Sequence, residues 1–162
     1  MSILVRHAMT QSPQTARPDL TAADAGGLMK QLDVGVVPVA EDGALIGLVT
    51  DRDLVLRVVA ERRDPEDVRL GDIMTRSPVT VTPDMKLSEA RDLMAKHRIR
   101  RLPVMKGEEL VGILSLGDVA IADASGREVG EALEDISESD STAAGLTSSP
   151  DRGTPGRTRR AG

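Results

Sequence analysis

When the chain is shifted by 65 positions, it matches itself without a gap. Met9-Thr10 then falls on Met74-Thr75, and Asp53 falls on Asp118. Self-similarity at a fixed period indicates that one supersecondary unit is used twice. A unit of about 60 residues is small for an independent hydrophobic core. We therefore expect the two copies to pack on each other as one body, and we expect any site of one copy to have a counterpart in the other.

The composition excludes several classes of function. The 162 residues contain no Cys and no aromatic residue, and the net charge is −5. Nucleic-acid sites usually need a basic surface and often stack bases on aromatic rings, so a nucleic-acid partner is not expected. The two histidines, His7 and His97, occupy non-equivalent positions of the repeat and predict no metal site. No apolar run approaches the length of a membrane span, so we expect a cytoplasmic protein without a membrane partner.

Apolar periodicity predicts the same elements in both copies. Helical stripes run over residues 20–33 and 87–97, and each is followed by a dense apolar run. Asp42-Gly43 between two apolar runs predicts a hairpin. A second helix is expected to carry Leu54, Val55, Val58 and Val59 on one face. With short extended segments near Thr15 and Thr80, the chain is expected to have an α/β (α+β) fold.

The repeat also gives a domain plan. We expect the first repeat to span residues 3–63, a connector 64–70, and the second repeat 71–124. An amphipathic C-terminal helix is expected over residues 125–137. Residues 138–162 are rich in Ser, Thr, Gly, Pro and Ala and predict a disordered tail.

The most informative motif is Gly47–Asp53, which recurs as Gly112–Asp118. In both copies an apolar strand ends at a hydroxyl residue, Thr50 or Ser115, and an Asp follows three positions later. This pattern is typical of a capping box, which satisfies backbone N–H groups at the start of a helix. The junction of a strand end and a helix start is also where open α/β units hold ligands, and phosphate suits a helix start. An Asp there can accept from the hydroxyls of a ribose. The sequence leaves both interpretations open.

The twin motifs, each preceded by an apolar strand with Pro-Val (Pro38-Val39 and Pro103-Val104), resemble a pair of cystathionine-β-synthase (CBS) domains. The leading segments Ala8–Thr10 and Asp72–Thr75 match that pattern too. The resemblance covers about residues 3 to 124 and extends to small stand-alone bacterial CBS-pair proteins, including the hypoxic-response type.

This resemblance implies two β-α-β-β-α units that are related by a pseudo-twofold axis, pack through their sheets and form a homodimer. It also implies clefts that bind AMP, ADP, ATP or S-adenosylmethionine as a regulatory ligand, not as a catalytic cofactor. By position, Asp53 and Asp118 would hold ribose hydroxyls with the help of Thr50 and Ser115. The residues that would line or close the adenine pockets are Val36, Val37, Pro38, Arg101, Leu102, Pro103, Thr15 and Thr80.

The copies differ in their arginines. Arg52 corresponds to Gly117, and the second copy carries Arg98, Arg100 and Arg101 where the first has Asp33, Gly35 and Val36. Guanidinium groups suit phosphate, so these side chains are either phosphate ligands or a solvated surface that balances nearby acids.

No catalytic constellation stands out, and we do not expect an enzyme. The leading hypothesis is an adenosyl-ligand sensor that signals through dimer geometry to an unidentified protein partner. The alternative is a ligand-free interaction scaffold or stress-response protein, in which the repeated turns only cap helices.

Overall fold

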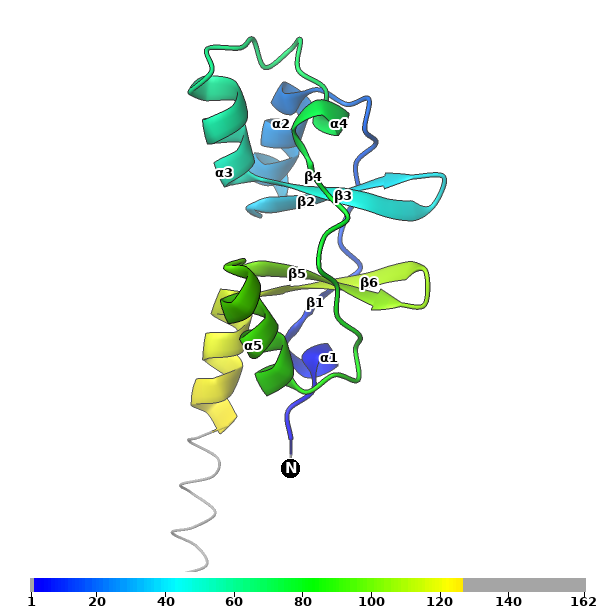
Figure 1. Ribbon diagram of the computed structural model, residues 1–162, viewed down its shortest axis with the longest axis vertical. Helices are drawn as coiled ribbons and strands as arrows, with labels where there is room; N and C mark the ends of the chain where they lie inside the picture. The colour runs from blue at the N-terminus through cyan, green and yellow to red at the C-terminus, as the bar shows by residue number, and fades with distance from the viewer. Residues whose placement is uncertain (1, 127–162) are drawn as a thin grey trace, which may run out of the picture. The chain divides into compact units, whose positions relative to one another are not determined.

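Two three-stranded sheets with helices on their outer faces make up the fold of the computed structural model, which describes residues 2–126 (Figure 1). The first sheet has the order β2-β3-β4 and the second β1-β6-β5. The strands are β1 (Thr10–Gln11), β2 (Val36–Glu41), β3 (Ala44–Thr50), β4 (Thr75–Arg76), β5 (Arg101–Lys106) and β6 (Glu109–Ser115). All pairings between these strands are antiparallel. The predicted mixed α/β fold class is confirmed.

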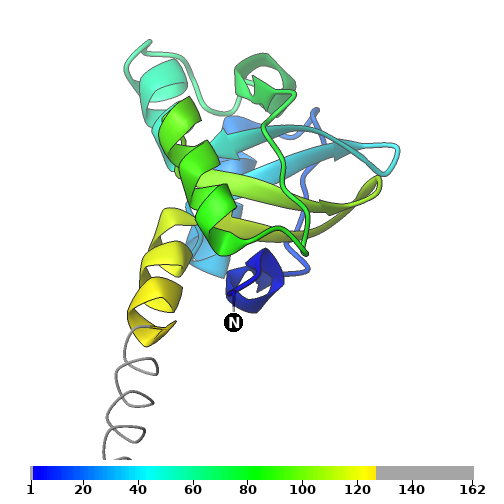
Figure 2. The ribbon, with the colours of Figure 1, turned by 60° about the horizontal axis from the view of Figure 1, so that its bottom comes forward.

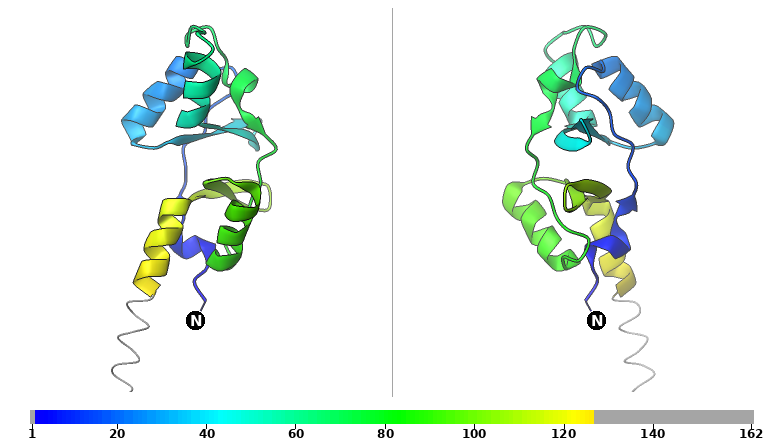
Figure 3. Two further views of the ribbon diagram at one scale, coloured as in Figure 1. Left: turned by 60° about the vertical axis from the view of Figure 1, so that its left-hand side comes forward. Right: turned by 90° about the vertical axis from the view of Figure 1, so that its right-hand side faces the viewer.

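The helices lie on the outer sides of the two sheets. They are α1 (Val5–Ala8), α2 (Ala22–Leu32), α3 (Asp51–Leu54), the π-helix η1 (Val55–Val59), α4 (Leu70–Ile73) and α5 (Leu87–His97), followed by a helix over residues 116–126. Each sheet turns its other face towards the other sheet (Figure 3). Val36, Leu48 and Ile113 form a small buried cluster from the two facing sheets. The expected packing of the two repeats through their sheets is therefore present.

The β2–β3 hairpin turns as its sequence predicts. Asp42 and Gly43 both have positive φ, 49° and 81°, which is what a two-residue type I′ turn requires. The β5–β6 hairpin turns at Gly107, whose φ is 63°. Both hairpins contain a register shift at the equivalent place, between Val39 and Ala40 and between Val104 and Met105.

The two repeats exchange their leading strands. β1, from the start of the first repeat, pairs with β6 of the second, and β4, from the start of the second repeat, pairs with β3 of the first. The helices before these strands follow them, so α1 lies with the second sheet and α4 with the first (Figure 2). Val5 of α1 is buried in the second core, and Leu70 and Ile73 of α4 are buried in the first. The segment 64–70, predicted as a connector, contributes Val68 to the first core. Each hydrophobic core thus depends on both repeats.

The second helix of the first repeat differs from the prediction. Leu54 and Val58 pack against the core, but Val55 and Val59 are 55% and 68% exposed. The backbone there is a π-helix in which the N–H of Ala60 donates to the carbonyl of Val55. Leu54 and Val58 form one i,i+4 stripe, and the neighbouring stripe of Val55 and Val59 faces away from the core.

Most of the predicted C-terminal helix (residues 125–137) and the whole predicted tail (138–162) lie outside the described residues. Residues 125 and 126 continue the helix that begins at residue 116. Within the described part of the chain, no helix is both long and apolar enough to cross a membrane.

Candidate functional site

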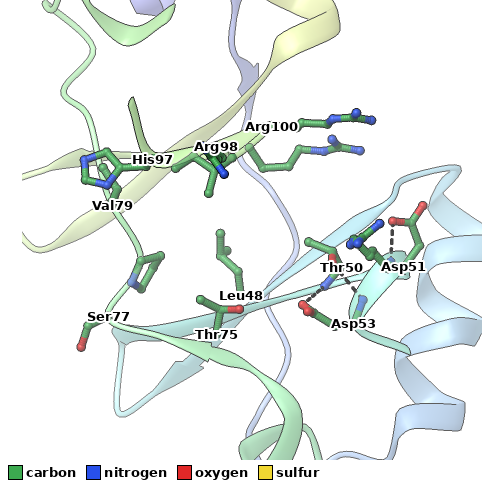
Figure 4. Close-up of a pocket in the computed structure, with 14 residues that line it drawn as sticks. Leu48, Thr50, Asp51, Asp53, Thr75, Ser77, Val79, His97, Arg98 and Arg100 are labelled. Atoms are coloured by element: carbon green, nitrogen blue, oxygen red, sulfur yellow. Dashed lines mark hydrogen bonds between the residues drawn. The ribbon is translucent and has the colours of Figure 1, made fainter. Parts of the chain in front are cut away.

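A cleft of about 850 Å³ opens between the two repeats. This volume lies within the usual range of small-molecule sites, roughly 300–1,000 Å³. Its walls come from three segments: the end of β3 with α3, the segment after β4 (Ser77, Pro78 and Val79, here called the strap), and the turn from α5 into β5 (Figure 4). The residues that line it are Leu48, Thr50, Asp51, Arg52, Asp53, Thr75, Ser77, Pro78, Val79, His97, Arg98, Ile99, Arg100 and Arg101.

The Thr50–Asp53 turn forms one wall and is held by a reciprocal capping box. The backbone N–H of Thr50 donates to Asp53 Oδ2 at 2.9 Å, and the N–H of Asp53 donates to Thr50 Oγ1 at 3.2 Å. The other carboxylate oxygen, Asp53 Oδ1, lies 3.8 Å from Arg57 Nε. The Asp53 side chain is 14% exposed and lines the cleft. The predicted cap is therefore present, but it occupies only one of the two carboxylate oxygens.

The equivalent turn of the second repeat has the same hydrogen bonds and one more. Asp118 Oδ2 accepts from the backbone N–H of Ser115 at 2.8 Å and from its hydroxyl at 2.6 Å. Ser115 Oγ in turn accepts from the N–H of Asp118 at 3.1 Å. The serine hydroxyl thus uses its hydrogen within the turn, whereas no hydrogen bond to an acceptor is found for the Thr50 hydroxyl among residues 2–126.

The glycine that opens each motif is explained by the exchanged strands. A Cβ at Gly47 would lie 2.7 Å from Met74 Sδ and 2.8 Å from the carbonyl oxygen of Thr75. At Gly112 the same distances would be 2.5 Å to Met9 Sδ and 3.0 Å to the carbonyl oxygen of Thr10. Real Cβ atoms do not approach this closely. The missing side chain lets the leading strand of the other repeat cross the motif, and in the first sheet that strand leads into the cleft wall.

The opposite wall of the cleft is basic. Arg98 and Arg100 on this wall follow α5 (Figure 4). Arg101 is next to them in the chain and lines the cleft too, whereas Arg52 lines it from α3, on the side of the Thr50–Asp53 turn. Arg101 reaches across to the first repeat: its Nη2 lies 3.0 Å from the place that a Cβ of Gly35 would occupy. The arginines that distinguish the two copies in the sequence therefore lie together at one cleft.

Of the predicted site residues, Thr50, Arg52, Asp53 and Arg101 are brought together in this cleft. Ser115 and Asp118 lie together in the equivalent turn of the other repeat. Thr15 lines a different hollow, of about 410 Å³, beside both hairpins, and Thr80 is exposed.

The residues predicted for the adenine pockets are buried in the sheets. Val37 and Leu102 belong to the first and second cores, and Val36 lies between the sheets. The carbonyl of Pro38 accepts from the N–H of Ala16, and that of Pro103 accepts from the N–H of Val81. These two carbonyls are thus already engaged by the segments next to Thr15 and Thr80.

Sequence reasoning missed the strap at Ser77, Pro78 and Val79 as a cleft wall. A signal was present, because Ser77-Pro78 matches Ser12-Pro13 in the repeat. It did not indicate a site, since a short polar segment also fits a plain connection. Within the described residues, no cluster of His, Cys, Asp or Glu could hold a metal ion.

The comparisons with known proteins agree with this geometry. The model of the CBS domain family matches residues 5–60 and again residues 70–125. The chain belongs to the CBS domain family. CBS domain proteins are generally regulatory and not catalytic.

Two curated relatives place the chain among small CBS-pair proteins. It is 43% identical over 133 residues to the CBS domain-containing protein YhcV of Bacillus subtilis, covering 82% of this chain and 94% of the relative. It is 33% identical over 101 residues to hypoxic response protein 1 of Mycobacterium tuberculosis, covering 62% of this chain and 71% of the relative. The resemblance to the hypoxic-response type is confirmed as a relationship.

Solved structures show the same fold. A hexameric CBS-CP12 protein from bloom-forming cyanobacteria matches with a TM-score of 0.70 at 35% identity, over 74% of this chain and 67% of that one. Hypoxic Response Protein I, solved with two coordinated zinc ions, matches with a TM-score of 0.65 at 28% identity, over 73% of this chain and 97% of that one.

Proposed function

We propose that the chain is a cytoplasmic regulatory module that binds an adenosyl ligand in the cleft between its two repeats. The observation that carries this proposal is the position of the Thr50–Asp53 turn on the wall of a ligand-sized cleft. A turn that only capped a helix would not need to face such a space.

The chemistry of this wall suits a ribose. Asp53 Oδ2 is held by the backbone, which fixes the carboxylate, while Oδ1 has, among residues 2–126, only the Arg57 guanidinium as an ionic partner, at 3.8 Å. A sugar hydroxyl can donate to Oδ1, and the Thr50 hydroxyl can donate to a second sugar oxygen. Both groups therefore offer the hydrogen bonds that a diol needs.

The base would be held without aromatic stacking. Leu48, Val79 and Ile99 provide aliphatic surface in the same cleft. Pockets for small ligands are mostly apolar with a few polar groups that fix orientation. Because these three side chains come from the first repeat, the strap and the second repeat, a bound base would bridge both halves of the molecule.

Self-association would carry the signal to a protein partner. Several apolar side chains are exposed on or next to the outer helices: Leu32, Val34, Val55, Leu56, Val59, Leu116 and Ile121. Exposed apolar groups of this kind are common where subunits meet. A homodimer through these helices is the assembly that we propose, and the CBS-CP12 protein of similar fold is described as a hexamer.

Thermal unfolding with and without ligand tests the proposal. AMP, ATP and S-adenosylmethionine are each added at increasing concentration, and binding at about 100 times Kd should stabilise the folded state by about 2.7 kcal/mol. Asp53→Ala should abolish this stabilisation.

The competing scaffold role predicts a different result. There, Asp53→Ala and Asp118→Ala would each lower the free energy of unfolding by about 0.5–2 kcal/mol, as loss of a cap does, with or without nucleotide. If no adenosyl compound raises the midpoint of the wild-type protein, ligand sensing is wrong and the scaffold role stands.

A further inference from the structure

Within residues 2–126, the arginines of the cleft have no carboxylate partner and lie together, whereas several other arginines of the protein are paired. Arg6, Arg17, Arg57 and Arg91 each lie within 4.0 Å of a carboxylate. In the described part of the chain, none of the four cleft arginines (Arg52, Arg98, Arg100 and Arg101) has a carboxylate that close. Four guanidiniums without an ion pair therefore line one cleft of a protein whose net charge is −5.

The charge of this cleft is opposite to that of the equivalent positions in the other half. Here four guanidiniums stand against the carboxylates of Asp51 and Asp53, which leaves a net charge of +2. The matching positions of the repeat carry no arginine, and Asp33 and Asp118 give them a net charge of −2. The net charge at matching positions of the two halves thus differs by four units, although their backbones follow the same plan.

The arginines project from a fixed backbone. The N–H of Arg98 donates to the carbonyls of Ala95 and Met94 at the end of α5, and the carbonyl of Arg100 accepts from the N–H of Leu116 at 3.0 Å. Arg101 pairs with Ser115 in the second sheet. An arginine whose backbone is fixed in this way loses less conformational entropy when it binds an anion. The planar fork of its guanidinium suits phosphate oxygens.

We propose that this cleft selects a phosphorylated adenosyl ligand, with Arg98 and Arg100 holding the phosphate, and that the equivalent positions of the other half, around the Ser115–Asp118 turn, do not. The inference rests on the proposed function and specifies its ligand. Asp53 and Thr50 would hold the sugar on one wall, and the phosphate would extend to the opposite wall. An uncharged nucleoside gains nothing from these arginines, and S-adenosylmethionine, whose net charge is positive, gains less from them than a nucleotide does.

Isothermal titration of the full chain with adenosine, AMP, ATP and S-adenosylmethionine tests this inference. AMP and ATP should bind at least about tenfold more tightly than adenosine, because one hydrogen bond to a charged group contributes that much. One nucleotide should bind per chain, and high salt should weaken nucleotides but not adenosine. Asp53→Ala should remove nucleotide binding, and Asp118→Ala should keep it.

Charge-swap variants identify the residues. Arg98→Asp copies Asp33, whose φ of 52° matches the 54° of Arg98, so the backbone accepts it. This variant and Arg100→Gly should bring AMP and ATP down to the affinity of adenosine while adenosine binding stays unchanged. Lys106→Asp, at the hairpin end of β5, makes the same charge change far along the strand and should change nucleotide affinity by much less than Arg98→Asp.

The outcomes separate the two proposals. If adenosine binds as tightly as AMP and ATP, or if Arg98→Asp and Lys106→Asp have equal effects, phosphate recognition by these arginines is wrong and the adenosyl site stands. Two nucleotides per chain would overturn the asymmetry. If none of the four ligands binds, the proposed function itself fails.

Discussion

The first and second repeats keep the same backbone devices and differ in the side chains that face the cleft. Both have a hairpin with a register shift at the equivalent place, and both have a Ser/Thr-x-x-Asp capping box. Both have a glycine where the exchanged strand crosses. By contrast, Arg98 and Arg100 of the second repeat correspond to Asp33 and Gly35 of the first. Positions that build the fold are thus matched, and positions that can recognise a ligand have diverged.

Separating the repeats should have the largest effect. A fragment of residues 1–63 lacks Leu70 and Ile73, which are 0% and 1% exposed in the first core, and also lacks Val68 and Met74. Each such loss costs about 2–5 kcal/mol, and the whole stability of a small domain is only about 5–15 kcal/mol. We expect this fragment to be unfolded by circular dichroism, whereas residues 1–126 fold.

Removing residues 2–11 from the full chain is the asymmetric counterpart. It deletes Val5 from the second core and β1 from the second sheet, and it leaves the first core complete. Amide exchange should therefore become fast in β5 and β6 and remain slow in β2 and β3. Equal loss of protection in both sheets would show that the second core cannot be destabilised without the first.

Alanine at Gly47 and at Gly112, where the exchanged strands cross, should destabilise the protein to different extents. Gly47→Ala places its Cβ 2.8 Å from a backbone oxygen, which has to move, and overpacking of this kind costs about 1–3 kcal/mol. At Gly112 the shortest contact, 2.5 Å, is to the flexible end of Met9, and the backbone oxygen is 3.0 Å away. Gly112→Ala should cost less in urea unfolding.

A rescue experiment checks the cause of this difference. Met9→Ala should restore part of the stability lost in Gly112→Ala, because it removes the side chain in the way. Met74→Ala should restore less in Gly47→Ala. The glycine explanation is wrong if both alanine variants are as stable as the wild type.

Arg57 is a bracing residue that only the first repeat has, since its counterpart is Ala122. Its Nη1 donates to the carbonyl of Ile73 at 2.5 Å, and its Nε lies 3.8 Å from Asp53 Oδ1. Arg57→Met, which keeps the apolar stem, should lower the free energy of unfolding by about 1 kcal/mol. Arg63→Met, also on the surface, serves as the control and should change little. Equal values for both variants would contradict the bracing role.

The smallest expected effect concerns the start of α2. Hydrogen bonds from the backbone and side chain of Thr21 lower the pKa of Asp24 below its ordinary value. The capping box contributes stability above the unfolded pKa of about 3.9 and loses it as the pH falls through the lower folded value. The equivalent helix α5 begins at Lys86 with a single 3.3 Å bond from its N–H to Glu89. Asp24→Asn should therefore flatten the acid limb of a stability–pH curve more than Glu89→Gln does.

The sequence predicted the duplication, the hairpins and the two capping turns because each is a local or periodic signal. Asp42-Gly43 allows few backbone conformations, and Thr50 and Asp53 lie within one turn. The exchange of β1 and β4 had no such signal. A strand of two residues has no alternation to detect, and its partner lies in the other repeat, about 100 residues away in the case of Thr10 and Ile113.

The candidate site was predicted in part for the same reason. Thr50, Asp53 and Arg101 were predicted as site residues from the motif and the repeat, and all three line one cleft. That they bind a ligand stays a prediction. The sequence could not show that Arg98 and Arg100 face the Thr50 turn of the other repeat, because this depends on how the two sheets pack. Likewise, it could not show that Val37 and Leu102 point into the cores.

The exchange of leading strands has a consequence for how such a protein could arise and evolve. A half-length chain with one copy would lack a strand and several core residues, and it would have to obtain them from a second molecule. Its folding would then be a bimolecular reaction that depends on protein concentration. Tandem fusion replaces that concentration with a constant effective molarity set by the linker. Once joined, the halves no longer need to be identical, and each can acquire charges that the other does not share.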